Sequence, residues 1–198
     1  MHRIYAHRGV SALAIENTES AIKLCVEHNI SAVEIDLQLL GDNSAVVFHD
    51  SNLARLAQKQ DDLINLSAQD LKSVQLSTAD KPSEPVLFMD QLIQLVNTHK
   101  LKVNIELKRF DQSIERYIQH IIKPILSKIP NQQLLISSFD FELLQAVRDY
   151  SKTVDIALLS RELEQDTFKK LKEISAIACH LQNQFLNLDD IKTVKEKV

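Results

Sequence analysis

The sequence predicts an α/β fold in which parallel strands close into a barrel surrounded by helices. Short strand-like runs alternate with helical patterns along most of the chain, which is typical of βαβ units with right-handed crossovers. Two of these runs, AVEIDLQL at 32–39 and KVNIELK at 102–108, keep one polar face, whereas the strands of an open sheet covered by helices on both faces are almost entirely apolar. A closed barrel accommodates the polar face, because alternate residues point into its interior while the others pack against helices.

The first part of the chain already shows the alternation. RIYAH at 3–7 has the composition of a short strand, and NTESAIKLCVEH at 17–28 follows with apolar residues at helical spacing. Asn17 or Thr18 is expected to cap this helix, because a short polar side chain accepts a hydrogen bond from the first turn. Its predicted inner face consists of Ala21, Leu24, Cys25 and His28. After the strand AVEIDLQL, AVVFHD at 45–50 predicts a third strand.

Residues 51–85 interrupt the alternation. This segment is polar, contains one helix-like piece, SAQDLKSVQL at 67–76, and has Pro82 and Pro85 near its end. We therefore expect an elaborated loop or a small lid between the repeating units.

The alternation resumes after this insertion. The helices expected here carry apolar residues on one face and lie at 89–99, 111–128, 140–149, 165–174 and from about 188. The strands expected between them lie at 102–108, 133–139, 153–159 and 176–181. No linker, charge block or low-complexity segment separates two parts of the chain, so residues 1–198 are expected to form a single domain.

Composition and charge exclude several classes of protein. The net charge is −4, and the 23 Lys and Arg residues are scattered, whereas a duplex-binding surface needs a concentrated basic stripe. Cys25 and Cys179 lie in apolar segments and are expected to be reduced thiols. The chain opens without an apolar targeting segment, and it has no apolar run of about 18 residues. We therefore expect a cytoplasmic protein without a nucleic-acid partner or a membrane span.

Carboxylates gather near the ends of the predicted strands. In a parallel barrel the carboxyl ends of the strands meet at one mouth, which carries the chemistry. Glu34 and Asp36 are two residues apart on one strand and project to the same side, and Glu106 lies on a later strand. Carboxylates in one mouth repel one another. A hard divalent cation with oxygen ligands, Mg²⁺ or Ca²⁺, relieves that repulsion and suits the site better than zinc.

Basic residues and histidines accompany these carboxylates. Arg8 and Lys108 beside a metal ion indicate an anionic substrate, most simply a phosphate group. His7 and His49 are the candidate acid and base, because imidazole titrates near neutrality.

Each feature also has a structural explanation by itself. An isolated Glu-x-Asp on a strand is more often a solvated face, and a lone histidine is more often a hydrogen-bonded residue at a strand end. Glu106 with Lys108 also fits a surface charge pair. These explanations require separate coincidences at four strand ends, so the conjunction favours a catalytic site.

Five short motifs follow one another along the chain: HRG at 7–9, IENT at 15–18, EIDLQL at 34–39, VVFHD at 46–50 and NIELK at 104–108. In order and spacing they resemble the glycerophosphodiester phosphodiesterase family. SSF at 137–139 fits a later strand motif of that family. The resemblance covers the chain from residue 3 to about 190.

The resemblance implies a TIM-type barrel that hydrolyses glycerophosphodiesters to an alcohol and glycerol 3-phosphate with a divalent cation. The metal ligands implied by motif position are Glu34, Asp36 and Glu106. The implied acid/base pair is His7 and His49, and the implied phosphate ligands are Arg8 and Lys108. Glu16 and Asn17 are expected to shape the loop after the first strand, with Asn17 capping the helix.

The sequence departs from the family pattern at several positions. Ile15, Leu40 and Asn43 stand where the family usually has proline, threonine and a turn glycine; asparagine tolerates a left-handed backbone, so the turn survives. After residue 181 only seventeen residues remain, whereas the family continues into an eighth strand and a closing helix. We therefore expect that C-terminal unit to be missing, which leaves two sheet edges exposed.

The expected gap has three explanations: a shortened chain with an otherwise intact site, which we favour, closure by a partner chain such as a homo-oligomer, or a stable open barrel. The leading functional hypothesis is metal-assisted hydrolysis of a small-molecule glycerophosphodiester, with His7 as proton acceptor and His49 as donor. The alternative is a catalytically impaired barrel that binds metal and phosphate. A phospholipase D-like activity on lipids ranks third, because no basic amphipathic helix or aromatic cluster is present for membrane docking.

Overall fold

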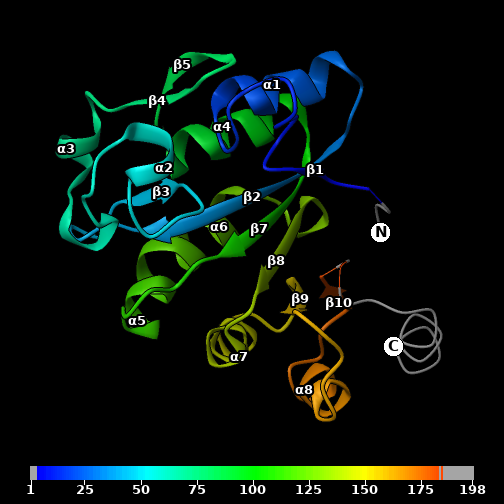
Figure 1. Ribbon diagram of the computed structural model, residues 1–198. Helices are drawn as coiled ribbons and strands as arrows, with labels where there is room; N and C mark the ends of the chain where they lie inside the picture. Colours follow the sequence, from blue (N-terminus) through cyan, green and yellow to red (C-terminus); the bar gives the residue numbers. More distant parts are fainter. Residues whose placement is uncertain (1–3, 183, 185–198) are drawn as a thin grey trace. The chain divides into compact units, whose positions relative to one another are not determined.

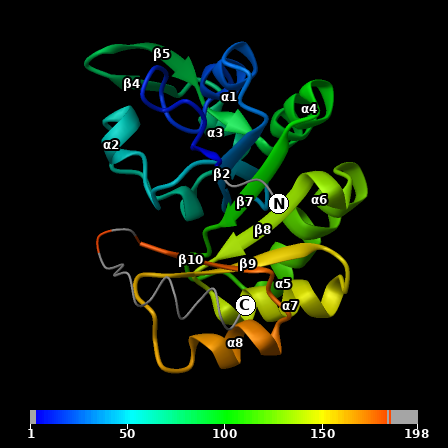
Figure 2. The same ribbon diagram turned by 90° about the vertical axis from the view of Figure 1, so that its right-hand side faces the viewer.

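The computed structural model describes residues 4–182 and 184. Its contacts divide the chain into two compact units, Met1–Leu134 and Leu135–Val198, called unit 1 and unit 2. Strands and helices alternate within each unit (Figures 1 and 2). The expectation that residues 1–198 form a single domain is not tested by this division and stays a prediction.

The sheet of unit 1 is arranged around β2, Ala32–Leu39. β2 pairs in parallel with β1, Ala6–His7, and with β7, Lys102–Leu107. It also pairs antiparallel with β3, Ala45–Val47, which in turn pairs antiparallel with β6, Leu87–Phe88. Every residue of β2 is buried, so the polar face of this strand does not meet bulk water.

The antiparallel pairing of β3 corrects the prediction of an all-parallel sheet. Residues 40–44 join β2 to β3, and this turn is far shorter than the dozen or more residues that a parallel crossover needs. Asn43 has φ 70° in the turn, a left-handed conformation that asparagine tolerates. The third strand also ends at Val47 and does not extend to Asp50.

The first helix, α1, Glu19–Glu27, begins after Thr18. The Thr18 hydroxyl accepts a hydrogen bond from the backbone N–H of Ala21 at 3.3 Å. Thr18 is therefore the N-cap, and the assignment of Asn17 as the cap is wrong. The predicted inner face is correct in part, because the buried side chains of α1 are Ala21, Ile22 and Cys25.

Helix α4, Met89–His99, occupies the residues predicted for it and lies beside α1. It also contacts α6, Lys123–Lys128, where Asn97 donates to the carbonyl of Lys128 at 3.0 Å. Helices α1, α4 and α6 are thus neighbours in sequence order, as expected of helices that surround parallel strands.

The helix predicted at 111–128 is interrupted. It begins as α5, Ile114–Tyr117, passes through a π-helical turn, Ile118–Ile122, and continues as α6. Pro124 has no N–H for the carbonyl of residue 120, and its ring would clash with that carbonyl in a regular helix. The wider π turn before Pro124 accommodates this defect.

Residues 51–85 are packed through their own apolar side chains. Their elements are α2, Ala54–Ala57, a 3-10 turn, Leu63–Asn65, α3, Ala68–Leu71, and a hairpin of β4, Gln75–Thr78, with β5, Lys81–Pro85. They share one hydrophobic cluster with β3 and its flanks: Ile15, Leu40, Val46, Phe48, Leu53, Leu56, Leu63, Leu71, Val74, Leu76 and Val86. The segment is therefore more ordered than a loop, and its role as a lid stays a prediction.

Unit 2 consists of parallel strands joined by helices. β8, Leu134–Ser138, pairs with β9, Asp155–Ser160, and β9 pairs with β10, Ala178–Leu181. The connecting helices are α7, Phe141–Tyr150, and α8, Thr167–Glu173. These are the βαβ repeats that the sequence predicts.

Two expectations concern the C-terminal end of the chain. The helix from about 188 and the missing eighth strand both lie outside the residues that the structure describes. Within those residues, no helix is long and apolar enough to cross a membrane. Cys25 and Cys179 are free thiols, as predicted.

Candidate active site

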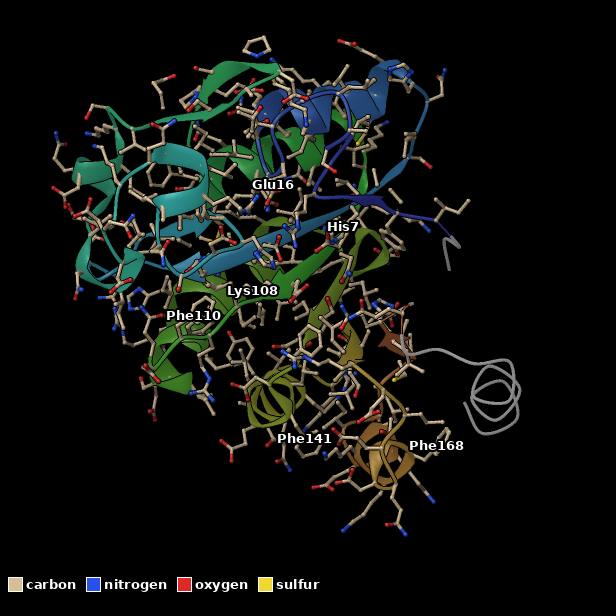
Figure 3. All side chains as sticks on the ribbon, viewed as in Figure 1. His7, Glu16, Lys108, Phe110, Phe141 and Phe168 are labelled. Atoms are coloured by element: carbon tan, nitrogen blue, oxygen red, sulfur yellow. The ribbon has the colours of Figure 1, made fainter. Side chains whose placement is uncertain are left out.

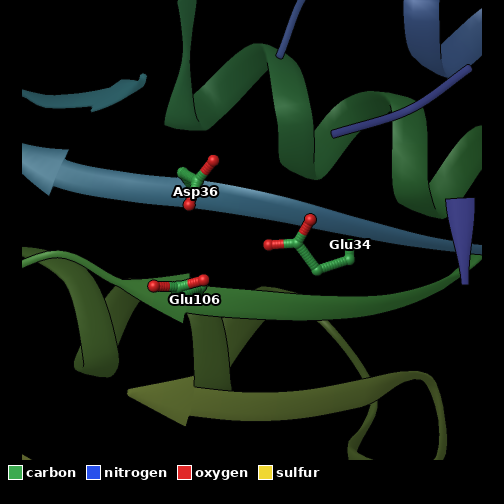
Figure 4. Close-up of side chains that lie close together, drawn as sticks. All are labelled: Glu34, Asp36 and Glu106. Atoms are coloured by element: carbon green, nitrogen blue, oxygen red, sulfur yellow. The ribbon is translucent and has the colours of Figure 1, made fainter. Parts of the chain in front are cut away.

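Three carboxylates meet between two neighbouring strands of unit 1. Glu34 and Asp36 lie on β2, and Asp36 is in register with Glu106 on the parallel strand β7. Residues two apart on one strand, and residues in register on neighbouring strands, project to the same side of a sheet. One oxygen of each carboxylate lies within 4.8 Å of the others (Figure 4). The three side chains are therefore close enough to bind one ion.

Burial distinguishes this cluster from a solvated strand face. The exposed fractions of its residues are 7% for Glu34, 0% for Asp36 and 9% for Glu106. Desolvation, and next the charge of Asp36, raises the pKa of Glu34 to about 8. Desolvation also raises the pKa of Glu106, although Lys108 opposes this shift. Since water does not screen the carboxylates, positive charge has to come from the protein or from an ion.

The ligands that this cluster offers fit a hard divalent cation. All three side chains present carboxylate oxygens, which Mg²⁺ and Ca²⁺ prefer. The Oε1 atom of Glu34 is buried and accepts no hydrogen bond within the part of the chain that the structure describes. This oxygen is available to a cation. The cluster offers neither the cysteine nor the histidine ligands that are typical of zinc.

Arg8 contacts the cluster through its backbone and its side chain. Its N–H donates to Glu34 Oε2 at 3.0 Å, and its Nε lies 3.2 Å from Asp36 Oδ2. Its Nη1 donates to Glu16 Oε1 at 2.8 Å. Arg8 has φ 56°, and such strain in a non-glycine residue persists only where the surroundings fix it. The backbone conformation thus aims the guanidinium at the carboxylates.

Lys108 approaches the cluster from the end of β7. Its Nζ forms an ion pair with Glu106 and lies 3.3 Å from Asp36 Oδ1. Its backbone N–H donates to the carbonyl of Leu37 at 3.0 Å, and its carbonyl accepts a hydrogen bond from the Tyr117 hydroxyl. The backbone of Lys108 is held on both sides, so the ammonium group is positioned above the carboxylates.

His7 ends strand β1 at the edge of the cluster. Its Nε2 lies 3.8 Å from Glu34 Oε2, and 69% of its side chain is exposed. Partial burial, and next the charge of Arg8, lowers the pKa of His7. A neutral imidazole at this place can accept a proton.

His49 follows strand β3. Its Nδ1 lies 2.6 Å from Asp50 Oδ1, a hydrogen bond that fixes the ring and leaves Nε2 for another partner. Desolvation is the main cause of the pKa shifts of His7 and Glu106, and positive charge on His49 adds to the lowering at His7 and opposes the raising at Glu106. His49 is thus within electrostatic reach of the other histidine and of the carboxylate cluster.

The residues that the sequence predicts for the site gather in one region of unit 1, where Figure 3 labels His7 and Lys108. They are His7, Arg8, Glu34, Asp36, His49, Glu106 and Lys108. None of them lies apart from the others, and the role assigned to each stays a prediction.

Sequence reasoning missed the function of Asn17 within this site. Asn17 Nδ2 donates to Asp36 Oδ2 at 2.8 Å, and the backbone N–H of Asp36 donates to Asn17 Oδ1 at 3.1 Å. Asn17 is 1% exposed and has φ 60°. Its amide therefore holds Asp36 at two points. The IENT motif contains Asn17, but the sequence does not distinguish an asparagine that caps a helix from one that hydrogen-bonds to a distant carboxylate.

A second missed contact joins the site to the 51–85 segment through Arg55 on α2. Arg55 donates to Glu16 at 2.7 and 2.9 Å, and its Nε donates to Asp50 Oδ2 at 2.7 Å. Burial raises the pKa of Glu16, but hydrogen bonds from Arg55 and Arg8 outweigh it and lower the pKa overall. Glu16 thus connects Arg8 with Arg55, and Asp50 connects Arg55 with His49. No motif in the sequence indicated a role for Arg55 in the site.

Comparison with known proteins identifies the family. The model of the glycerophosphoryl diester phosphodiesterase family matches residues 7–197. The chain belongs to this family. Members of the glycerophosphoryl diester phosphodiesterase family use a divalent cation, which agrees with the acidic cluster of this chain.

Two curated relatives cover most of the chain. An uncharacterized protein of Mycoplasma genitalium is 30% identical over 158 residues, which is 74% of this chain and 62% of that protein. A glycerophosphodiester phosphodiesterase of Caldanaerobacter subterraneus subsp. tengcongensis is 26% identical over 159 residues, which is 79% of this chain and 65% of that protein. The chain thus spans slightly less than two thirds of the length of these relatives.

Solved structures show the fold. A phosphodiesterase from Oleispira antarctica, in complex with the product sn-glycerol-3-phosphate, has a TM-score of 0.91 and 22% identity, covering 99% of this chain and 81% of that one. A glycerophosphodiester phosphodiesterase from Thermotoga maritima has a TM-score of 0.70 and 21% identity, covering 91% and 75%. The fold is of the TIM-barrel type that glycerophosphoryl diester phosphodiesterases adopt, as the sequence predicts.

Proposed function

We propose that this chain hydrolyses glycerophosphodiesters to an alcohol and glycerol 3-phosphate, with Mg²⁺ or Ca²⁺ as the divalent cation. The observation that carries the proposal is the buried cluster of Glu34, Asp36 and Glu106 with Arg8 and Lys108 in contact. Membership of the family supports the reaction. The glycerol 3-phosphate bound to the Oleispira antarctica phosphodiesterase supports the choice of product.

In this proposal the three carboxylates hold the cation, and Arg8 and Lys108 bind the phosphate. When bound, the cation supplies positive charge that stabilises a phosphoryl oxygen and lowers the pKa of an attacking oxygen. Arg8 presents a planar fork of N–H donors that matches two phosphate oxygens, and Lys108 adds a point charge. Both already lie within 3.3 Å of Asp36, so they meet a phosphate beside the carboxylates without large movement.

His7 and His49 would transfer the protons. His7 accepts the proton of the attacking oxygen, from water or from the 2-hydroxyl of the glycerol, as the new phosphorus–oxygen bond forms. The lowered pKa of His7 keeps it neutral near pH 7 and suits this role. His49 donates a proton to the departing alkoxide as the bond between phosphorus and the alcohol oxygen breaks. Where the 2-hydroxyl has attacked, water then opens the cyclic phosphodiester. Each transfer typically contributes about 10²–10⁴-fold.

Turnover by the purified full chain tests the proposal. With Mg²⁺ or Ca²⁺ and glycerophosphoethanolamine, we expect release of glycerol 3-phosphate, measured by an enzyme-coupled assay, and loss of the signal with EDTA. Replacement of His49 by Asn should reduce kcat by about 10²-fold or more. If the folded, cation-loaded chain releases no glycerol 3-phosphate, the proposed activity is wrong.

The other outcomes correspond to the alternatives. Calorimetric binding of glycerol 3-phosphate without turnover would support the catalytically impaired barrel. Turnover of a lysophospholipid in preference to the deacylated diester would support the lipid-directed activity. The cytoplasmic location and a homo-oligomeric state stay predictions of the sequence.

A further inference from the structure

Gln38 is the third polar residue on the buried face of β2, and the proposed reaction gives it no role. It follows Asp36 by two residues, as Asp36 follows Glu34, so the three side chains project to the same side of the strand. Gln38 is 2% exposed. A buried amide needs hydrogen-bond partners, and the position of those partners indicates what the side chain holds.

The amide of Gln38 reaches the two carbonyls that flank His49. Its Nε2 donates to the carbonyl of Phe48 and to the carbonyl of Asp50, each at 2.8 Å. An amide nitrogen carries two hydrogens, and both serve these bonds. Because both partners are acceptors, only the nitrogen end of the side chain can face them. Gln38 therefore holds the backbone on either side of the histidine.

The ladder between β2 and β3 stops short of the histidine, because β3 ends at Val47. In an antiparallel ladder, hydrogen-bonded residues exchange both of their N–H···O bonds. Phe48 donates its N–H to the carbonyl of Asp36 at 3.1 Å, but the N–H of Asp36 donates to Asn17 Oδ1 and does not return the bond. The carbonyl of Phe48 is thus left to Gln38, whose side chain takes the place of the ladder at this point.

The ring of His49 depends on the same stretch of backbone. Its Nδ1 lies 2.6 Å from Asp50 Oδ1, and Asp50 is one of the two residues whose carbonyl Gln38 holds. A shift of this backbone would therefore move the histidine together with the carboxylate that orients its ring. A proton donor has to lie within about 2.6–3.2 Å of the oxygen that it protonates, and a misplacement of about 1 Å can cost about 10²-fold in rate.

We propose that Gln38 is a positioning residue for His49. It fixes the histidine so that Nε2 gives its proton to the departing alcohol oxygen as the bond between phosphorus and that oxygen breaks. Gln38 itself does not touch the substrate and acts only through the histidine. The inference rests on the proposed function and adds a residue to it. Strand β2 thereby carries two proposed ligands of the cation and the residue that positions the proton donor.

Two substrates separate proton donation from the other steps: glycerophosphoethanolamine and the para-nitrophenyl diester of glycerol 3-phosphate. Both offer the same glycerophosphoryl group, but nitrophenolate leaves as a weakly basic anion, whereas an alkoxide needs a proton. Gln38→Met keeps the size of the side chain and removes both N–H donors. We expect kcat to fall about tenfold or more with the ethanolamine diester and by less than about twofold with the nitrophenyl diester. His49→Asn should show the same dependence on the leaving group.

Gln112→Met is the matched control. Gln112 is 4% exposed, and its Nε2 donates to the carbonyl of Leu39 at 3.0 Å. The change therefore also removes a buried hydrogen bond between an amide and a carbonyl, but one that does not belong to the backbone around His49. A purely structural loss changes kcat for both substrates by the same factor, and we expect that result for Gln112→Met.

Gln38→Asn provides a second variant, which keeps the inference testable if Gln38→Met does not fold. Its amide is one methylene shorter and cannot reach both carbonyls, so it should show the same dependence on the leaving group with a smaller loss. Circular dichroism and the shift in Tm with Mg²⁺ or Ca²⁺ identify the variants that fold and bind the cation.

A double-mutant cycle with His49 tests whether the effect passes through the histidine. If it does, the two changes are not additive, and Gln38→Met in the His49→Asn chain should lower kcat for the ethanolamine diester by less than about twofold. Equal losses in the wild-type and His49→Asn chains would overturn the inference. A loss from Gln38→Met that is the same for both substrates would also overturn it.

Further readouts separate this inference from the proposed function. If both diesters are turned over and the Gln38 variants keep the wild-type kcat, the inference is wrong while the activity stands. If the wild-type chain turns over neither diester, the proposed function fails, and NMR of the His49 Nδ1 proton decides the inference by itself. We expect this proton, hydrogen-bonded to Asp50, to give a resonance that Gln38→Met broadens or removes and Gln112→Met keeps. A resonance that is absent from the wild-type chain, or unchanged in Gln38→Met, would overturn the inference.

Discussion

Asp36 is fully enclosed, and three side chains bring hydrogen bonds or positive charge to its oxygens. Asn17 donates to it, and Arg8 and Lys108 lie within 3.3 Å of its oxygens. Glu34 has fewer hydrogen-bond donors, because one of its oxygens accepts no hydrogen bond among the described residues. The same strand therefore carries one carboxylate with several polar partners and one whose ionised form is disfavoured by burial.

The raised pKa of Glu34 predicts that the cation-free protein becomes less stable as pH rises. The unfolded chain loses the Glu34 proton near pH 4.5, whereas the native chain keeps it to about pH 8. Between these values the native state binds more protons, so the free energy of unfolding falls with increasing pH. The loss should be on the order of a few kcal/mol between pH 5 and pH 8, at about 1.4 kcal/mol for each unit of pKa difference.

Urea denaturation in EDTA at pH 5, 6.5 and 8 measures this dependence. Glu34→Gln keeps the size and an acceptor oxygen but cannot ionise, so its curve should be flatter. Equal slopes for the wild-type chain and the variant would contradict the assignment of the titration to Glu34.

The two hydrogen bonds between Asn17 and Asp36 predict a large effect of Asn17→Ala. The substitution leaves the buried N–H of Asp36 without its acceptor, removes one donor from Asp36 Oδ2, and puts alanine at φ 60°. We expect a loss of about 2–4 kcal/mol in the free energy of unfolding. Asn29→Ala is the matched control, because Asn29 has φ 56° but is exposed. It should cost only about 1 kcal/mol, and equal losses in urea denaturation would show that the clamp contributes nothing.

At the scale of elements, β2 and the 51–85 segment contribute different residues to the site. β2 contributes carboxylates to the cluster because alternate residues share one face. The 51–85 segment shares a hydrophobic cluster with β3 and its flanks. From α2, Arg55 forms ion pairs with Glu16 and Asp50. The insertion is thus connected to the loop of Arg8 and to the loop of His49.

This connection predicts that Arg55→Lys reduces activity more than stability. Lysine keeps the charge but cannot donate to Glu16 and Asp50 together in a planar fork. We expect kcat/KM for a glycerophosphodiester to fall about tenfold, while the free energy of unfolding changes by less than about 1 kcal/mol, because 45% of the Arg55 side chain is exposed.

Lys59→Gln is the control for Arg55→Lys, since Lys59 is an exposed residue of the same segment. Steady-state kinetics and urea denaturation on both variants give the comparison. An Arg55→Lys enzyme with the kcat/KM of the wild-type chain would show that the network does not serve the reaction.

At the scale of the molecule, the candidate site belongs to one unit. All residues of the carboxylate cluster and both histidines lie within Met1–Leu134. Unit 2 repeats the βαβ pattern with parallel pairing of its own strands. Cation binding should therefore stabilise unit 1 directly.

A divalent cation should raise the thermal stability of the whole chain and protect unit 1 most. At a free concentration of 100 times Kd, binding adds about 2.7 kcal/mol to the free energy of unfolding, which corresponds to a rise in Tm of about 5–10 °C for a chain of this size. Hydrogen exchange should slow in β2 and β7, the strands that carry the ligands.

Glu106→Gln should abolish the shift in Tm with Mg²⁺ or Ca²⁺, whereas Glu115→Gln, a change at an exposed acid of the same unit, should keep it. A shift that persists in Glu106→Gln would place the cation elsewhere.

Many features of this protein follow from the local pattern of its sequence. The buried carboxylate face of β2, the extent of α4 and the parallel repeats of unit 2 could all be predicted, because side-chain periodicity is a local property that directly reports which face is covered. The ordered motifs also indicated the family and the residues of the site. Glu34, Asp36 and Glu106 were expected together for that reason, and they do meet.

Only the tertiary structure decided which residues hold that cluster. Asn17 looks like a helix cap in the sequence, yet its amide clamps a carboxylate nineteen residues away. Arg55 lies in a polar insertion without any motif, yet it joins two loops of the site. Contacts between residues distant in sequence depend on how elements pack in space, and side-chain periodicity carries no information about that packing.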